Sequence, residues 1–295
     1  MEPSDDPISV SVCKEQHSQY INSIQQVLPS LQITELNEDE KSPDCMFIED
    51  TCVVVGDIVV VTQPGDPSRR PEIPPVRQFW EKLLAKNEST AISKVIIMEE
   101  EDSEATLDGG DVLFVPDRDF YETYPCSTIW CGDLFVGISA RTNERGAEVL
   151  RKAFAPLNIN VHNVSLSASN SDKFDTLHLK SLTTALAPST LVIGTNETSR
   201  RVKKLMNDIF ERKYGKDFTC KWIEVPDVAA ANILVINGIV FFPVNFQESQ
   251  KILEKAICEH NGNSKQQINN ELVIINATEA AKADGALTCS CVLYQ

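Results

Sequence analysis

The sequence predicts an α/β fold, a five-bladed α/β propeller whose ββαβ units close into a ring through the chain termini. Paired apolar runs joined by turn residues recur along the chain, and each pair is followed by an amphipathic stretch and a further apolar run. Each unit is too small to bury its own apolar face, so the units must pack against one another. The strand-like character of both chain ends supplies the fifth unit.

Four units are complete within the chain. The first has apolar runs at 46–55 and 58–62, which flank a Gly-Asp pair and predict a β-hairpin, and then a helix over 75–85 and a strand over 94–98. The others are expected to place their two strands, helix and last strand at 107–114, 134–139, 144–154 and 159–162, at 177–182, 191–194, 197–213 and 220–225, and at 230–236, 239–242, 248–258 and 272–275.

The fifth unit would join the two ends of the chain. It combines a strand at Ile8–Val12, a helix over 14–27 and a strand over 31–36 with a terminal strand that begins near Cys289. Closure through the termini predicts that residues 1–295 form a single domain. Hydrophobic residues make up 42% of the chain, which is enough to bury a sizeable core.

The charge balance limits the possible partners. With 27 Lys and Arg against 43 Asp and Glu, the net charge is -16, which argues against nucleic acid or an anionic membrane and suits a small cationic ligand. The first residues do not have the composition of a secretory signal, and no apolar run is long enough to span a membrane. We therefore expect a cytoplasmic protein. Its nine cysteines are scattered, so we expect them to be reduced thiols in the cytosol and to hold no structural metal.

Among the cysteines, Cys289 is the one placed to meet a substrate. It follows an Asp-Gly turn at 284–285 and opens a short alternating run, so it is expected at the start of a strand next to a loop. Cys291 should point to the same side of that strand and is the main rival nucleophile.

Seven stretches, taken in order, carry a family resemblance that covers nearly the whole chain after about residue 14. They are PDCMFIED at 43–50, PGDPSRR at 64–70, LDGGDVLF at 107–114, ISARTNERGAE at 138–148, LHLKS at 177–181, VPDVAAAN at 225–232 and DGALTC at 284–289. Together they resemble the dimethylarginine dimethylaminohydrolases of the pentein, or guanidino-group-modifying, superfamily. The five-bladed fold of that superfamily agrees with the repeat count.

The resemblance implies hydrolysis of asymmetric dimethylarginine and monomethylarginine to citrulline and a methylamine, which clears inhibitors of nitric oxide synthase. It implies Cys289 as nucleophile, His178 as general acid and base, and Asp108 as the carboxylate that orients the histidine. A thiolate suits a guanidinium carbon, which is a poor electrophile, and the covalent intermediate is a thiouronium. The reaction needs no metal or organic cofactor.

The resemblance also implies contacts for each charged group of the substrate. The paired carboxylates of the 49–50 step would hold the guanidinium, a third acid the α-amino group, two arginines the α-carboxylate, and a backbone carbonyl would add a further contact. These residues are Glu49, Asp50, Asp44, Arg69, Arg141 and Ala283.

Two departures from the family pattern concern activity. Relatives begin with a strand and a loop that closes over the substrate, and this segment is shortened here, so weak substrate binding or poor exclusion of water is expected. Residues 116–131 form an insertion between two strands that are tightly connected in relatives, and the loop 165–173 ahead of His178 is long.

Two other functions remain open. A hydrolase for unmethylated arginine or another guanidino compound differs only in pocket shape, which the sequence does not show. An inactive propeller that serves as an interaction protein is the alternative from another class. Of the other histidines, His162 is expected to be a satisfied core or surface residue, and His17 and His260 are expected to face solvent.

Overall fold

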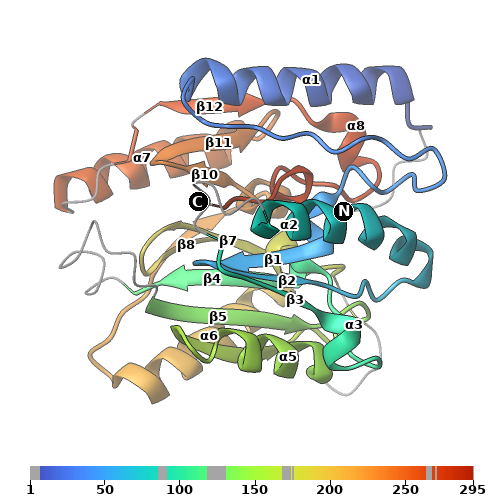
Figure 1. Ribbon diagram of the computed structural model, residues 1–295. Helices are drawn as coiled ribbons and strands as arrows, with labels where there is room; N and C mark the ends of the chain where they lie inside the picture. Colours follow the sequence, from blue (N-terminus) through green and yellow to red (C-terminus); the bar gives the residue numbers. More distant parts are fainter. Residues whose placement is uncertain are drawn as a thin grey trace.

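The computed structural model describes residues 7–85, 92–117, 131–167, 174, 176–263, 268–269 and 271–294. Within these residues the strands form four separate three-stranded sheets (Figure 1). The sheets are β1 (Cys52–Val55), β2 (Ile58–Val61) and β3 (Lys94–Ile97); β4 (Val112–Pro116), β5 (Cys131–Ile138) and β6 (Asn158–Ser165); β7 (Thr183–Ala187), β8 (Thr190–Gly194) and β9 (Lys221–Val225); and β10 (Leu234–Ile236), β11 (Ile239–Pro243) and β12 (Leu272–Ile275).

All four sheets have the same strand topology. The first strand pairs antiparallel with the second, and the second pairs parallel with the third, as in β1, β2 and β3. The same order holds in the other three sheets. The middle strand therefore lies between two partners, and in β2 all residues from Ile58 to Val61 are buried. The four predicted ββαβ units are confirmed.

The crossover from second to third strand in each unit contains a helix. These helices are α2 (Ile73–Ala85), α5 (Glu144–Phe154), α6 (Glu197–Tyr214) and α7 (Gln247–Asn263). The α5 helix starts where Asn143 caps it by accepting a hydrogen bond from the Gly146 amide, and Asn196 caps α6 through the Ser199 amide. Arg151 and Lys152 in the last turn of α5 complement the helix dipole.

Neighbouring units share their apolar cores. One buried cluster joins Val60 of β2 to Leu134 of β5 and Leu150 of α5. Another joins Leu113 of β4 to Met206 of α6. In these clusters the sheets bury apolar surface against their neighbours, which is the packing that the small size of the units requires.

The chain termini differ from the prediction. Residues Ile8–Val12 do not form a strand, because α1 (Val10–Val27) begins there, and Val10 and Val12 are exposed. The α1 helix lies beside α8 (Thr278–Ala281) and β12 (Figure 1). Gln16 binds the Glu279 amide with its side-chain oxygen, and the Glu279 carboxylate accepts from the Ser9 amide. These polar contacts favour a helix at this position.

Two other predicted terminal strands are also wrong. Residues 31–36 form no strand in the sheets of the described residues, and Cys289 lies in the 3-10 turn η6 (Thr288–Ser290). The fifth unit therefore does not appear as a ββαβ sheet in the described part of the chain. The two ends nevertheless meet, since the Tyr20 hydroxyl of α1 donates to the Leu287 carbonyl at 3.1 Å.

The first strand of every unit starts later than the sequence predicts. The runs 46–55 and 230–236 become strand only at Cys52 and Leu234. The run 107–114 becomes strand only at Val112, after the 3-10 turn η3 (Gly109–Asp111), and the run 177–182 is a loop and the 3-10 turn η4 (Leu179–Ser181) ahead of β7. The insertion 116–131 connects β4 to β5, which pair as far as Pro116 and Gly132, but its residues 118–130 lie outside the described residues. Residues 168–173 of the loop before His178 do as well.

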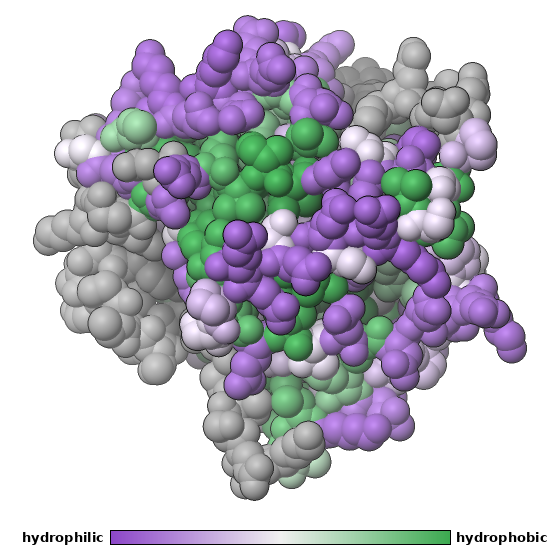
Figure 2. All heavy atoms as spheres, turned by 90° about the horizontal axis from the view of Figure 1, so that it is seen from above, coloured by the Kyte–Doolittle hydropathy of each residue, from purple (hydrophilic) through white to green (hydrophobic). Residues whose placement is uncertain are grey.

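The surface on the α1 side is mixed. Polar side chains border apolar ones that gather near the middle of this face (Figure 2). In the described chain, no helix has both the length and the apolar composition needed to cross a membrane. The described cysteines are free thiols.

A buried carboxylate on β5 anchors α6, and we expect its loss to destabilise the protein. Asp133 accepts hydrogen bonds of 2.6 Å from Lys213 and Tyr214 and lies 2.6 Å from His162. Asp133→Asn should lower the free energy of unfolding by about 2–4 kcal/mol at pH 7, because the amide cannot accept from all three groups. Urea unfolding measures this change, and Asp208→Asn on the exposed face of α6 is the matched control.

The same carboxylate predicts a pH dependence. Burial raises the pKa of Asp133, but its hydrogen bonds with His162, Lys213 and Tyr214 outweigh burial and lower it. A lowered pKa adds stability above the unfolded value, near pH 4, and this contribution is lost as the pH falls through the folded value. The difference between wild type and Asp133→Asn should therefore shrink between about pH 4 and pH 2. An equal difference at pH 7 and pH 2 would contradict this assignment.

Candidate active site

Equivalent 3-10 turns of neighbouring units meet at the candidate site. Each turn leads into the first strand of its unit: η1 (Ile48–Thr51) precedes β1, η3 precedes β4, η4 precedes β7, and η5 (Val228–Ala231) precedes β10. The turn η1 contacts both η3 and η6, and η4 contacts η3 and η5. Residues far apart in the sequence are thereby brought together at the ends of the sheets.

His178 and Asp108 form a buried pair. His178 Nε2 lies 3.1 Å from Asp108 Oδ2, and the other oxygen of Asp108 accepts from the Gly65 amide at 2.9 Å. Gly110 is required here, since a Cβ atom would lie 2.5 Å from His178 Nδ1. The carboxylate is thus held in place to fix the orientation of the imidazole ring.

The charges around His178 keep it protonated. Burial lowers its pKa, but the charge of Asp50, the hydrogen bond to Asp108 and the charge of Asp111 raise the pKa to about 9. The carboxylate of Asp111 accepts from the Ser139 hydroxyl at 2.6 Å and from the amide of Leu179, the residue after His178, at 2.9 Å. Burial raises the pKa of Asp111 to about 6, although His178 and Ser139 act in the opposite direction. The imidazolium is available as an acid at neutral pH.

Glu49 is paired with a lysine that sequence reasoning did not assign. Lys180 Nζ lies 2.5 Å from Glu49 Oε1, and Thr288 Oγ1 donates to Glu49 Oε2 at 3.0 Å. Both groups are largely buried, and burial raises the pKa of Glu49 despite the lysine. Asn232 connects this cluster, because its amide nitrogen donates to the Lys180 carbonyl and to Thr288 Oγ1. The sequence signal was present in the LHLKS and VPDVAAAN stretches, but nothing in it pointed to an ion pair.

Asp50 and Arg69 form a second buried ion pair. Arg69 Nη1 lies 2.5 Å from Asp50 Oδ2, while Nε and Nη2 bind both oxygens of Glu72. The same Nη2 atom also donates to the carbonyls of Asp44 and Phe47. Burial raises the pKa of Asp50, but His178 and Arg69 outweigh it and lower the pKa. The guanidinium of Arg69 is therefore occupied by the protein itself.

Cys289 lies partly buried in η6, near the ion pairs of Glu49 and Asp50. Its Sγ accepts from the Ala286 amide at 3.4 Å. Burial and the charges of Glu49 and Asp50 raise the pKa of the thiol well above its ordinary value, and the Ala286 amide and Lys180 offset this only in part. The free protein therefore holds a thiol, and a cation placed between the thiol and the carboxylates would favour the thiolate.

Removing one of these charges should make the thiol more reactive. In Glu49→Gln we expect iodoacetamide to alkylate Cys289 about 3- to 10-fold faster at pH 8, because the lost charge lowers the thiol pKa. Mass-spectrometric peptide mapping separates Cys289 from the other cysteines, and Glu38→Gln on the exposed loop is the control. An unchanged rate would mean that Glu49 does not influence the thiol.

The other predicted contact residues lie toward the surface. Arg141 Nη1 binds Asp66 at 2.7 Å, with 28% of the arginine side chain exposed. Asp44 is half-buried, and Ala283 is exposed. Asp44 lies close to the ion pair of Arg69 and Glu72. Burial raises the pKa of Glu72, and the charge of Asp44 raises it further.

One group of possible metal ligands coincides with this site. In the described chain, Asp50, Asp108 and His178 offer ligand atoms within 4.8 Å of one another, and all three are buried. Each already has partners in the protein, namely Arg69, the Gly65 amide and the two carboxylates. The set suits the orientation of a histidine as well as it suits a cation.

Known proteins resemble the chain along most of its length. A Bos taurus protein provisionally named as the hydrolase DDAH2 is 28% identical over 272 residues, 89% of this chain and 78% of that protein. The N(G),N(G)-dimethylarginine dimethylaminohydrolase of Streptomyces coelicolor is 27% identical, over 86% of this chain and 76% of that protein. The enzyme of the same name from Pseudomonas aeruginosa is 24% identical, over 93% of this chain and 85% of that protein. The chain is thus similar to the dimethylarginine dimethylaminohydrolases along most of its length. No family profile matches it.

Solved structures agree on the α/β fold of this family. The Pseudomonas aeruginosa enzyme, a cysteine-to-serine mutant in complex with citrulline, superimposes with a TM-score of 0.69 at 21% identity, over 98% of this chain and 91% of that one. The N-terminal domain of ArgZ, a cyanobacterial arginine dihydrolase, gives a TM-score of 0.63 at 18% identity, over 94% and 85%. At these identities the superpositions concern the fold.

Proposed function

We propose that the protein hydrolyses asymmetric dimethylarginine and monomethylarginine to citrulline plus dimethylamine or methylamine. The observation that carries the proposal is the buried pair of Asp108 and His178 beside the turn η1, which carries Glu49 and Asp50 and contacts the turn η6 of Cys289. The names of the bacterial relatives support the same reaction. A cationic substrate also suits the acidic surroundings of the thiol.

The reaction follows a covalent route. Cys289 Sγ attacks the guanidinium carbon, and the sulfur–carbon bond forms as the thiol proton is lost to solvent or to a neighbouring base. His178, charged at neutral pH, donates a proton to the departing dimethylamine, which leaves a thiouronium on the sulfur. The neutral imidazole then takes a proton from a water molecule that attacks the same carbon. The carbon–sulfur bond of the resulting adduct then breaks, citrulline leaves, and the sulfur takes up the proton that the adduct's hydroxyl group loses, which restores the thiol.

The substrate cation activates its own nucleophile. The charges of Glu49 and Asp50 raise the pKa of Cys289 in the free protein. A guanidinium held by these carboxylates neutralises that effect, so the thiolate forms when the substrate is in place. At the other end of the substrate, Arg141 holds the α-carboxylate, Asp44 the amino group, and the Ala283 carbonyl adds a contact. Arg69 holds Asp50 in position through the ion pair between them.

The proposal is tested by offering the purified protein asymmetric dimethylarginine, monomethylarginine and arginine side by side and measuring citrulline. We expect the two methylated substrates to give the higher kcat/KM. Production of methylamines in equal amount to citrulline would confirm the reaction. Folded protein that turns over none of the three would exclude it and favour the interaction protein.

Arginine hydrolysis is the second candidate. Its specific support is the likeness to ArgZ, whose N-terminal domain binds the product of an arginine dihydrolase. The two candidates share the nucleophile and differ in how the pocket receives the methyl groups. Arginine as the best substrate in the same assay would establish the second candidate.

A further inference from the structure

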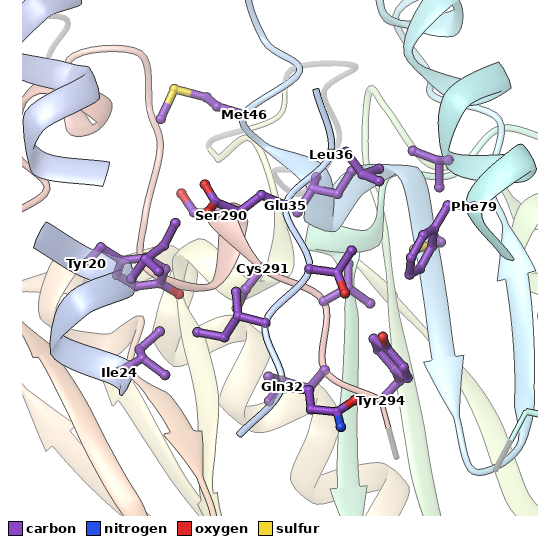
Figure 3. A pocket seen from close by; sticks show the side chains of 18 of the residues that line it. Tyr20, Ile24, Gln32, Glu35, Leu36, Met46, Phe79, Ser290, Cys291 and Tyr294 are labelled. Carbon is purple, nitrogen blue, oxygen red and sulfur yellow. The ribbon is translucent and has the colours of Figure 1, made fainter. Parts of the chain in front are cut away.

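Two sulfur atoms from distant parts of the chain meet at the surface of α1. Cys13 Sγ of α1 lies 3.8 Å from Met46 Sδ, and the two residues are 33 positions apart in the sequence. Figure 3 shows the Met46 side chain directed toward α1. Both residues are half-buried. Thiolate and thioether groups are the protein ligands that soft metal ions such as Cu(I) prefer.

A histidine lies beside the two sulfur atoms. His17 follows Cys13 by one helical turn, and residues four apart project from the same face of a helix. Cys13, His17 and Met46 all line one cavity of about 20 Å³, which can hold a single small occupant. In the described chain, the His17 ring contacts that of Tyr20 but takes part in no hydrogen bond. A ring nitrogen is therefore available as a third ligand.

The larger polar side chains around this cavity already have partners. Gln16 accepts from the Glu279 amide and donates to two other side chains, and Tyr20 donates to a backbone carbonyl. The Glu279 carboxylate accepts from a backbone amide and pairs with Lys282 at 2.9 Å. Apart from the Ser290 hydroxyl, the side-chain donors that remain at the cavity are two sulfur atoms and an imidazole.

The spacing of the sulfur atoms suits a bound ion without rearrangement. With metal–sulfur bonds of about 2.3 Å, two sulfur atoms 3.8 Å apart form an angle of about 110° at the metal. This angle is suited to a three- or four-coordinate ion, so a position remains for the histidine. The spacing of the cysteines in the sequence does not reveal such a set, because only one of its members is a cysteine.

We propose that Cys13, Met46 and His17 form a binding site for a single Cu(I) ion. Burial and the charge of Glu279 raise the pKa of the Cys13 thiol, so the free protein holds a thiol, and its proton passes to solvent as the copper–sulfur bond forms. Thiolate and Cu(I) together are neutral, which suits a cavity whose other walls are largely apolar. Copper stays in the +1 state throughout. Zinc is less suited, because a thioether is not among its usual ligands.

Competition for Cu(I) tests the proposal. The full chain, kept reduced under argon, is titrated with Cu(I) in the presence of bathocuproine disulfonate, whose copper complex absorbs visible light. We expect each chain to retain a single copper ion with sulfur and nitrogen ligands in its X-ray absorption spectrum. Cys13→Ser and Met46→Leu should each weaken retention about 10-fold or more, and His17→Phe about 3-fold or more, because each removes a ligand.

Variants of other thiols serve as matched controls. Cys45 is adjacent to Met46 in sequence, but its Sγ lies 3.9 Å from the Asp39 carbonyl, and Cys258 is exposed on α7. Cys45→Ser, Cys258→Ser and Cys289→Ser should leave copper retention within about 2-fold of wild type, because they supply no ligand. Circular dichroism verifies that all variants are folded, and Met46→Leu nearly conserves side-chain volume.

Three results would overturn the proposal. The first is a folded wild-type chain that retains no copper against the competitor. The second is copper retention that Cys13→Ser and Met46→Leu leave unchanged, or that one of the control variants abolishes. The third is equal affinity for Zn²⁺, because soft sulfur ligands would then not select the ion.

Discussion

Replacing Cys289 with serine is expected to lower citrulline production by about 10³-fold or more, because a hydroxyl is a much weaker nucleophile than a thiolate. Cys289 is the thiol whose pKa responds to Glu49 and Asp50, the carboxylates proposed to hold the guanidinium. Steady-state assays with the methylated substrates measure the loss. A mass increase on the wild-type chain during turnover, absent from the variant, would identify the thiouronium.

Cys291→Ser is the matched control for this experiment. Cys291 lies in the same segment, but its Sγ donates to the Thr288 carbonyl at 3.8 Å, and the residue lines a pocket together with Tyr20 and Ile24 (Figure 3). Burial raises its pKa to about 11, with the hydrogen bond of Tyr20 acting in the opposite direction. Its replacement should change kcat less than about 3-fold. If Cys291→Ser were the inactive variant and Cys289→Ser the active one, the nucleophile would have been assigned to the wrong cysteine.

Replacing Arg69 with methionine is expected to destabilise the protein by about 3–5 kcal/mol, because it leaves Asp50 and Glu72 buried without their cation. Only 8% of the Arg69 side chain is exposed, and its nitrogens donate to both carboxylates and to two backbone carbonyls. Chemical unfolding followed by circular dichroism measures the loss.

Arg141→Met distinguishes a structural arginine from a binding one. Arg141 is more exposed and pairs with Asp66 near the surface, so its removal should cost less than about 1 kcal/mol of stability. It should instead raise KM more than it lowers kcat, because an α-carboxylate contact would be lost. If Arg69→Met left stability unchanged, the buried network would not hold the site together.

The fold could be predicted where local pattern decides it. Middle strands such as β2 and β8 are buried on both faces, so their sequences are continuous apolar runs that no other element matches in so short a length. The ends failed for a physical reason. Ile8–Val12 alternates like a strand, but its Ser9 amide donates to the Glu279 carboxylate, and the Glu279 amide donates to Gln16 further along the same helix. Both contacts depend on a residue more than 260 positions away in the sequence.

The candidate site, like the fold, could be predicted only in part. The motif stretches allowed Asp108, His178, Glu49 and Asp50 to be placed in one cluster, and the structure brings all four together near Cys289. The partners of the charged groups could not be foreseen. Lys180 meets Glu49 across 131 positions, and Arg69 meets Asp50 across 19, so nothing local marks either pair.

The ion pair between Lys180 and Glu49 means that the candidate site already contains a cation. In the proposed reaction, a guanidinium would therefore exchange with an ammonium at Glu49 instead of meeting an unpaired carboxylate. The free energy of binding would then be the difference between two similar pairings, and the net charge of the site would depend on where the lysine moves. Affinity should consequently respond more to the shape of the methylated end than to the strength of the charge.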